Sequence, residues 1–118
     1  MNTVFSIHWY LAVAIWYFVN GILHDIFVLK GHKGGYDREL LRLLMDGHVL
    51  ILSGLLLLIS WLMLRQGLVW GALTGLTVGL GMIIYCVMIF PFLKSLVTML
   101  LSLIICVISL VLYFKLKG

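Results

Sequence analysis

Four long apolar runs dominate this sequence, and they constrain its fold more than any other feature. They cover Val4–Leu29, Leu43–Leu64, Leu68–Phe90 and Leu96–Phe114. The hydrocarbon core of a bilayer is about 30 Å thick and needs about 20 consecutive apolar residues in a helix. The runs are continuous, whereas the strands of a transmembrane barrel alternate between apolar and polar residues. The sequence therefore predicts an all-α integral membrane protein, with residues 1–118 forming a single domain, a four-transmembrane-helix bundle.

Composition supports a membrane protein and excludes several other classes. Hydrophobic residues make up 64% of the chain and charged residues 10%, and the mean hydropathy is +1.25. A soluble domain is about 45–50% apolar and about 25% charged, so a water-soluble fold and a disordered chain are excluded. The net charge of +4 comes from only eight basic residues that lie between apolar runs. We therefore expect no nucleic-acid partner.

The connections between the runs differ in length. Arg65 to Gly67 and Pro91 to Ser95 are short links, and short links make consecutive helices antiparallel neighbours. Gly67 is placed for the left-handed residue that ends many helices. Pro91 is expected to end the third helix, because proline cannot continue a helix.

The first link, Lys30–Arg42, is long and holds half of the chain's basic residues. Asp37 is a good N-cap residue, so we predict that the second helix begins near Asp37 and projects from the bilayer before entering it. Arg42 and Asp46 are spaced i, i+4 for a salt bridge. The basic link could rest on anionic headgroups, since each Lys or Arg near such a surface contributes about 1 kcal/mol.

The distribution of basic residues predicts an orientation. Four spans place the first and third links on one side of the membrane, with five Lys and Arg residues against three on the other side. Under the positive-inside rule, both termini lie outside, and we expect the membrane to be a prokaryotic cytoplasmic membrane. Inverted or dual insertion is the alternative.

Two stripes of small residues predict helix contacts. The third run carries Gly71, Gly75 and Gly79, and the fourth carries Ser95, Thr98, Ser102, Cys106 and Ser109 on one narrow arc. Small residues let helices approach closely in lipid. The stripes are therefore seams, either within the bundle or between two copies that self-associate. Cys86 and Cys106 lie at different expected depths, so we expect no disulfide between them.

Ionisable residues inside a membrane are costly and indicate functional sites. The candidate binding residues of this chain lie near one membrane face on the first two helices: Tyr17, Asn20, His24, Asp25, Asp46, His48 and Ser53. Helical periodicity predicts that five of them line an inward polar pocket: Tyr17, Asn20, His24, Asp46 and Ser53. His48 points about 160° away from Asp46 on the same helix, so the two histidines and two aspartates cannot all converge within one bundle.

Three hypotheses for function follow from these residues. The first is a homo-oligomeric transporter or binding protein for a small solute or ion, using His24 and Asp46. The second is a haem- or metal-binding redox protein that uses His24 and His48 as ligands, although the direction of His48 weakens it. The third is a non-catalytic subunit or lipid-binding partner of a larger membrane complex. No catalytic residue is assigned.

Overall fold

The computed structural model describes residues 3–90 and 96–117, which form four helices. They are α1 (Thr3–Gly31), α2 (Arg38–Arg65), α3 (Val69–Ile89) and α4 (Leu96–Lys117). All four are long and apolar enough to cross a membrane. The prediction of an all-α bundle of four membrane-spanning helices is confirmed. Pro91 and the rest of the third link lie outside the described residues.

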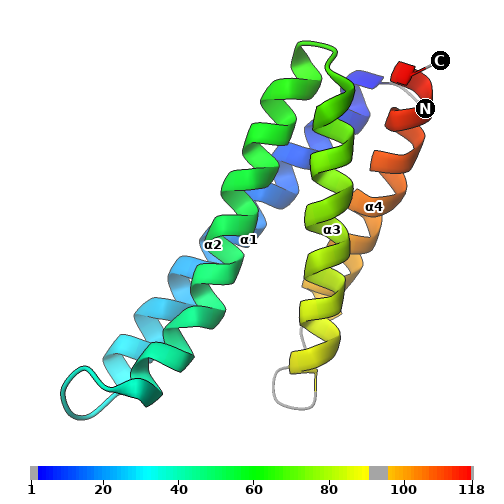
Figure 1. Ribbon diagram of the computed structural model, residues 1–118. Helices are drawn as coiled ribbons and strands as arrows, with labels where there is room; N and C mark the ends of the chain where they lie inside the picture. The colour runs from blue at the N-terminus through cyan, green and yellow to red at the C-terminus, as the bar shows by residue number, and fades with distance from the viewer. Residues whose placement is uncertain (1–2, 91–95, 118) are drawn as a thin grey trace.

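The helices run alternately up and down (Figure 1). Each helix packs against the next one in the chain, and α1 also contacts α4, so the bundle closes into a ring. Both termini and the α2–α3 turn lie at one end, which we call the terminal end. The α1–α2 link lies at the opposite end, the linked end (Figure 1). The side of the membrane on which each end lies stays a prediction.

The α1–α2 hairpin is longer than the α3–α4 pair. Helices α1 and α2 have 29 and 28 residues, against 21 and 22 in α3 and α4. At 1.5 Å per residue the first pair is about 10 Å longer, and the extra length lies at the linked end (Figure 1). Helix α2 begins where the sequence predicted, because Asp37 is its N-cap and accepts a hydrogen bond from the Leu40 N–H at 2.9 Å.

The α2–α3 turn has the geometry expected for a glycine-terminated helix. Gly67 has φ of +77°, in the left-handed region that favours glycine. The N–H groups of Gly67 and Leu68 donate to the carbonyls of Leu64 and Met63. These two bonds form a Schellman motif, which turns the chain directly into α3. The prediction for Gly67 is confirmed.

Helices α1 and α2 form a close glycine-mediated contact that the sequence analysis did not identify. Helices α1 and α2 meet through Gly21, Gly47 and Gly54. A Cβ at Gly21 would lie 2.6 Å from the Gly47 carbonyl oxygen, and a Cβ at Gly54 would lie 2.9 Å from the Ala14 carbonyl oxygen. Backbone atoms therefore limit this seam, and only glycine permits the observed separation.

The two predicted small-residue stripes lie inside the bundle. A Cβ at Gly71 would meet the Ser60 carbonyl of α2 at 2.8 Å, and one at Gly79 would meet Cys106 Sγ of α4 at 2.7 Å. The described residues of the α4 stripe are buried too: Thr98, Ser102, Cys106 and Ser109. Of the two alternatives for these stripes, contact within the bundle holds for their described residues, and self-association through them stays a prediction. Ser95 lies outside the described residues.

Side-chain hydrogen bonds join α1 to α4 along the bundle. The hydroxyl groups of Tyr10 and Tyr17 bond to Ser109 and Ser102, and all four side chains are fully buried. Buried hydroxyls need partners where no water is present. These pairs therefore satisfy the hydroxyl groups of both helices, and they close the bundle between its middle and its terminal end.

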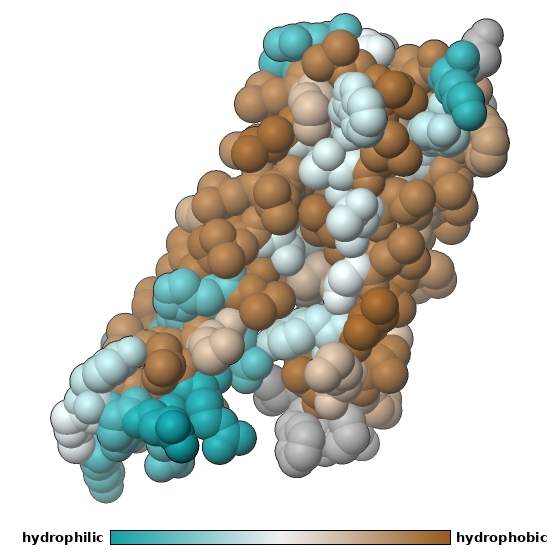
Figure 2. Space-filling model, viewed as in Figure 1, coloured by the Kyte–Doolittle hydropathy of each residue, from teal (hydrophilic) through white to brown (hydrophobic). Residues whose placement is uncertain are grey.

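The outer surface suits a lipid environment. Large apolar side chains are exposed on all four helices, and most of the face shown in Figure 2 is hydrophobic. Hydrophilic atoms gather at the linked end of α1 and α2 (Figure 2). An apolar surface of this extent on four spanning helices is that of an integral membrane protein in contact with lipid.

Candidate binding site

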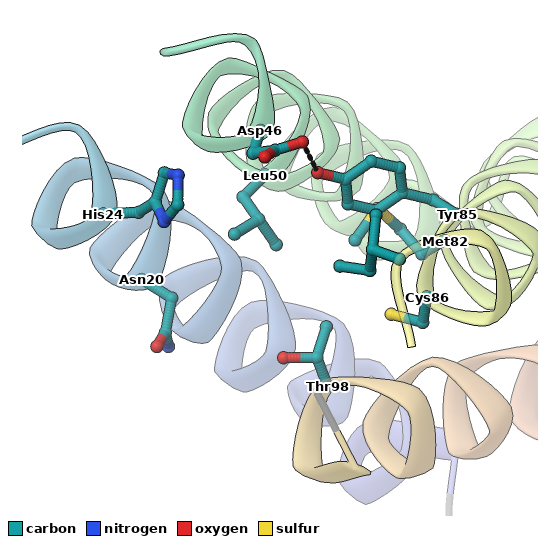
Figure 3. A pocket seen from close by; sticks show the side chains of 9 residues that line it. Asn20, His24, Asp46, Leu50, Met82, Tyr85, Cys86 and Thr98 are labelled. Atoms are coloured by element: carbon teal, nitrogen blue, oxygen red, sulfur yellow. Dashed lines mark hydrogen bonds between the residues drawn. The ribbon is translucent and has the colours of Figure 1, made fainter. Parts of the chain in front are cut away.

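A polar cavity lies between the two helix pairs, on the linked-end side of the tyrosine contacts. Its volume is about 190 Å³, and Figure 3 shows the residues around it. All four helices contribute side chains: Asn20, His24, Asp46, Leu50, Met82, Tyr85, Cys86, Ile89 and Thr98. An engineered cavity of about 150 Å³ holds benzene, so the space suits a ligand of only a few non-hydrogen atoms.

Asp46 is held at the cavity wall by Tyr85. The Tyr85 hydroxyl donates to Asp46 Oδ1 at 2.5 Å, and the second carboxylate oxygen lies on the side facing His24 (Figure 3). The salt bridge expected between Arg42 and Asp46 does not form among the described residues. Instead Asp46 turns toward α3, because a short charge-assisted bond to a phenol is available there.

Tyr85 is the principal site residue that the sequence analysis missed. The expected depth of Tyr85 in the membrane could have indicated it. Asp46 and Tyr85 lie about 20 residues on either side of the Gly67 turn, and residues equally far from a tight turn between antiparallel helices lie at the same depth. A tyrosine at the depth of an intramembrane aspartate is a natural hydrogen-bond partner.

His24 lies on the α1 side of the cavity. Its Nε2 donates to the Leu43 carbonyl oxygen at 3.1 Å, which assigns the hydrogen of the neutral ring to Nε2. Nδ1 then carries a lone pair, and no described residue hydrogen-bonds to it. His24 therefore adds an acceptor to the cavity beside the carboxylate of Asp46.

Asp25 and His48 form a separate pair outside the cavity. His48 Nδ1 lies 3.1 Å from Asp25 Oδ2 and 3.0 Å from the Leu44 carbonyl oxygen. The side chain of Asp25 is 13% exposed and that of His48 is 65% exposed. Asp25 Oδ1 packs against Gly47 with no hydrogen-bond partner among the described residues. Neither side chain lines the cavity.

Of the other residues predicted for the pocket, one lines the cavity and two make contacts outside it. Asn20 lines the cavity, and its Nδ2 donates to the Trp16 carbonyl at 2.8 Å. Tyr17 packs against α4 instead, where it hydrogen-bonds to Ser102. Ser53 donates to Met82 Sδ at 3.1 Å, so it positions a lining residue without lining the cavity. Three of the five residues predicted for the pocket therefore line it.

The cavity continues into a wider groove toward the linked end. This groove has a volume of about 780 Å³ and shares His24, Asp46 and Ile89 with the cavity. Glu39 and Arg42 from the first turns of α2 also line it. Toward the terminal end, fully buried Tyr17 and Leu57 lie between the helices. Among the described residues, the groove therefore extends from the cavity toward the linked end.

The arrangement gives little support to a metal or haem site. His24 lines the cavity, whereas His48 contacts Asp25 outside it. Within residues 3–90 and 96–117, no three His, Cys, Asp or Glu side chains are grouped as metal ligands would be. Cys86 and Cys106 are both free thiols. What the site offers is one carboxylate, several neutral acceptors and apolar walls.

Comparison with known proteins identifies no matching family, no similar curated protein and no similar solved structure. Functional inference for this chain therefore depends on the cavity and its surroundings.

Proposed function

We propose that the protein binds a small polar solute in this cavity and acts as a transporter for it. The observation that carries the proposal is the Asp46 carboxylate, set by Tyr85 into a cavity that all four spanning helices line. Charged side chains within membrane spans are costly, and they mark solute and ion pathways. A merely structural aspartate would be surrounded by packed side chains, whereas Asp46 borders both the cavity and the groove.

A cavity that continues into a groove toward one end of the bundle fits one state of a transport cycle. The groove leads to the linked end, and the Tyr10–Ser109 and Tyr17–Ser102 pairs close the other half of the bundle. Passage to the far side requires these contacts to open or a second copy to complete the route. We therefore include self-association in the proposal, and size-exclusion chromatography with light scattering measures it directly.

Flux into liposomes tests the transport proposal. Purified protein is reconstituted, and uptake of an amine, a neutral amino acid, a sugar and potassium is compared with uptake by empty vesicles. We expect at least one solute class to enter faster with protein, and Asp46→Asn to remove that flux. Wild-type flux equal to that of empty vesicles for every class would contradict transport.

The chain provides a matched control for this substitution. Asp25 is the other aspartate of the two membrane-spanning helices near the linked end, and it faces away from the cavity toward His48. Asp25→Asn makes the same chemical change, and the amide oxygen can still accept a hydrogen bond from His48 Nδ1. Flux should survive Asp25→Asn, so equal losses in both variants would indicate damage to the fold.

We also propose that the cavity faces the cytoplasm, with the basic link on anionic headgroups. Lys30, Lys33, Arg38 and Arg42 lie at the linked end, and none makes an ion pair with a described acidic residue. Single cysteines introduced by His32→Cys and Gln66→Cys, each combined with Cys86→Ala and Cys106→Ala, test the orientation in intact cells. An impermeant maleimide should label the cysteine at 66 and not the one at 32. Labelling at 32 alone would show the opposite orientation and contradict the proposal.

A further inference from the structure

The hydrogen-bonding state of the cavity points to the chemical class of its ligand. Three polar hydrogens of the wall are directed to protein acceptors. The Tyr85 hydroxyl donates to Asp46, His24 Nε2 donates to the Leu43 carbonyl, and Asn20 Nδ2 donates to the Trp16 carbonyl. Each of these donors is therefore engaged before any ligand arrives.

The acceptors of the same side chains are left open. Asp46 Oδ2, His24 Nδ1 and Asn20 Oδ1 have no hydrogen-bond partner among the described residues. The lining donors that stay available are one N–H of Asn20, the thiol of Cys86 and the hydroxyl of Thr98, which itself accepts from the Trp16 indole at 3.1 Å. All three are neutral, whereas the strongest open acceptor is a carboxylate. The cavity is thus complementary to a ligand that donates hydrogen bonds and carries positive charge.

The rest of the wall favours an organic cation over a metal ion. Leu50, Met82 and Ile89 supply apolar surface, and the Tyr85 ring beside Asp46 can attract a cation over its face. Calcium takes six to eight oxygen ligands and magnesium takes six, far more than these side chains offer. An alkylammonium ion has N–H donors for the acceptors and a short apolar part for the walls.

We propose that the ligand of this cavity is a small protonated amine, with Asp46 as its counter-charge and His24 and Asn20 as further acceptors. The cavity volume of about 190 Å³ limits it to a compact molecule, comparable to benzene in size. This inference rests on the part of the proposed function that places ligand binding in this cavity. It does not depend on whether the protein moves that ligand across the membrane.

Thermal stabilisation of the purified protein by four probes of similar size tests the ligand class. Propylammonium carries charge and donors, tetramethylammonium carries charge without donors, 1-propanol is neutral, and propionate is an anion. A ligand at free concentration L that binds only the folded state stabilises it by RT ln(1 + L/Kd), so at equal concentration the tighter ligand gives the larger rise in melting temperature. At constant ionic strength, we expect propylammonium to stabilise at the lowest concentration and propionate to have no effect. Equal or stronger stabilisation by propanol, propionate or sodium chloride alone would overturn the inference.

Two variants then test whether propylammonium binds in this cavity. Asp46→Asn should raise the apparent dissociation constant of propylammonium about tenfold or more, because a charge-assisted hydrogen bond is lost. Asp25→Asn should leave it unchanged. An unchanged constant in Asp46→Asn would place amine binding elsewhere and refute the proposal. The comparison of probes on the wild-type protein needs no variant, so it decides the question even if Asp46→Asn does not fold.

The outcomes separate this inference from the transport proposal. Amine binding that depends on Asp46, together with liposome flux equal to that of empty vesicles, would support the ligand class and refute transport. Asp46-dependent flux of a sugar or a neutral amino acid, without amine binding, would support transport and refute the ligand class.

Discussion

The glycine seam between α1 and α2 makes a quantitative prediction about packing. In Gly54→Ala, the added Cβ would lie 2.9 Å from the Ala14 carbonyl oxygen and 3.1 Å from the Phe18 nitrogen. Ordinary contact begins at 3.4 Å, so the two helices must move apart locally by about 0.5 Å. Both neighbours are backbone atoms of another helix, and no side-chain rotation can relieve the contact.

The magnitude follows from two opposing effects. Overpacking in a close-packed interior costs about 1–3 kcal/mol, whereas glycine to alanine in a helix interior gains about 1 kcal/mol in propensity. We therefore expect Gly54→Ala to destabilise the bundle by up to about 2 kcal/mol relative to the wild type, and by about 1–3 kcal/mol relative to an alanine substitution that meets no neighbour. Gly81→Ala is the matched control, because Gly81 is also within a membrane-spanning helix and a Cβ there meets nothing within 4 Å.

Reversible unfolding in mixed micelles, titrated with a denaturing detergent and followed by tryptophan fluorescence, measures both variants. Gly81→Ala should have a free energy of unfolding equal to or above that of the wild type, and Gly54→Ala should have a lower one. If Gly54→Ala is as stable as Gly81→Ala, the helices are not limited by backbone contact at this seam, and the account of α1–α2 packing is wrong.

Three further predictions concern local features. Tyr10→Phe removes the hydrogen bond to Ser109 and should lower stability by about 0.6–1.7 kcal/mol in the same unfolding assay. Asp37→Ala removes the N-cap of α2 and should cost about 1 kcal/mol, seen as faster hydrogen exchange at the Leu40 amide. Gly67→Ala forces alanine to φ of +77° and should cost about 1–2 kcal/mol, with no change in far-UV circular dichroism.

Local signals in the sequence were sufficient for the four helices and for the ends of α2. Apolar length, Asp37 as a cap and Gly67 as a left-handed residue act within one or two turns, so one sequence specifies them. The partner of each small residue could not be predicted in the same way. Gly71 packs on α2 and Gly79 on α4, because helices that cross at an angle present the same face to different neighbours at different depths.

The sequence predicted the membrane depth of the cavity residues more accurately than the direction in which their side chains point. Asn20, His24 and Asp46 line the cavity as expected, since depth follows from residue number along a helix. Tyr17 and Ser53 do not line it, because each has a hydrogen-bond partner on another helix, Ser102 and Met82. Such partners depend on how the helices are rotated against one another, and the sequence of one helix does not contain that information.

Helical geometry also explains why two aspartates near the same depth have different roles. Successive residues on a helix point about 100° apart, so His24 and its neighbour Asp25 cannot face the same space. The α1–α2 seam at Gly21 and Gly47 lies between them: His24 lines the cavity inside the bundle, and Asp25 packs against Gly47 and pairs with His48 outside the cavity. The two aspartates therefore share a membrane depth but not access to the cavity, and an effect of Asp46 that Asp25 lacks must arise from the cavity or from the Tyr85 hydrogen bond at its wall.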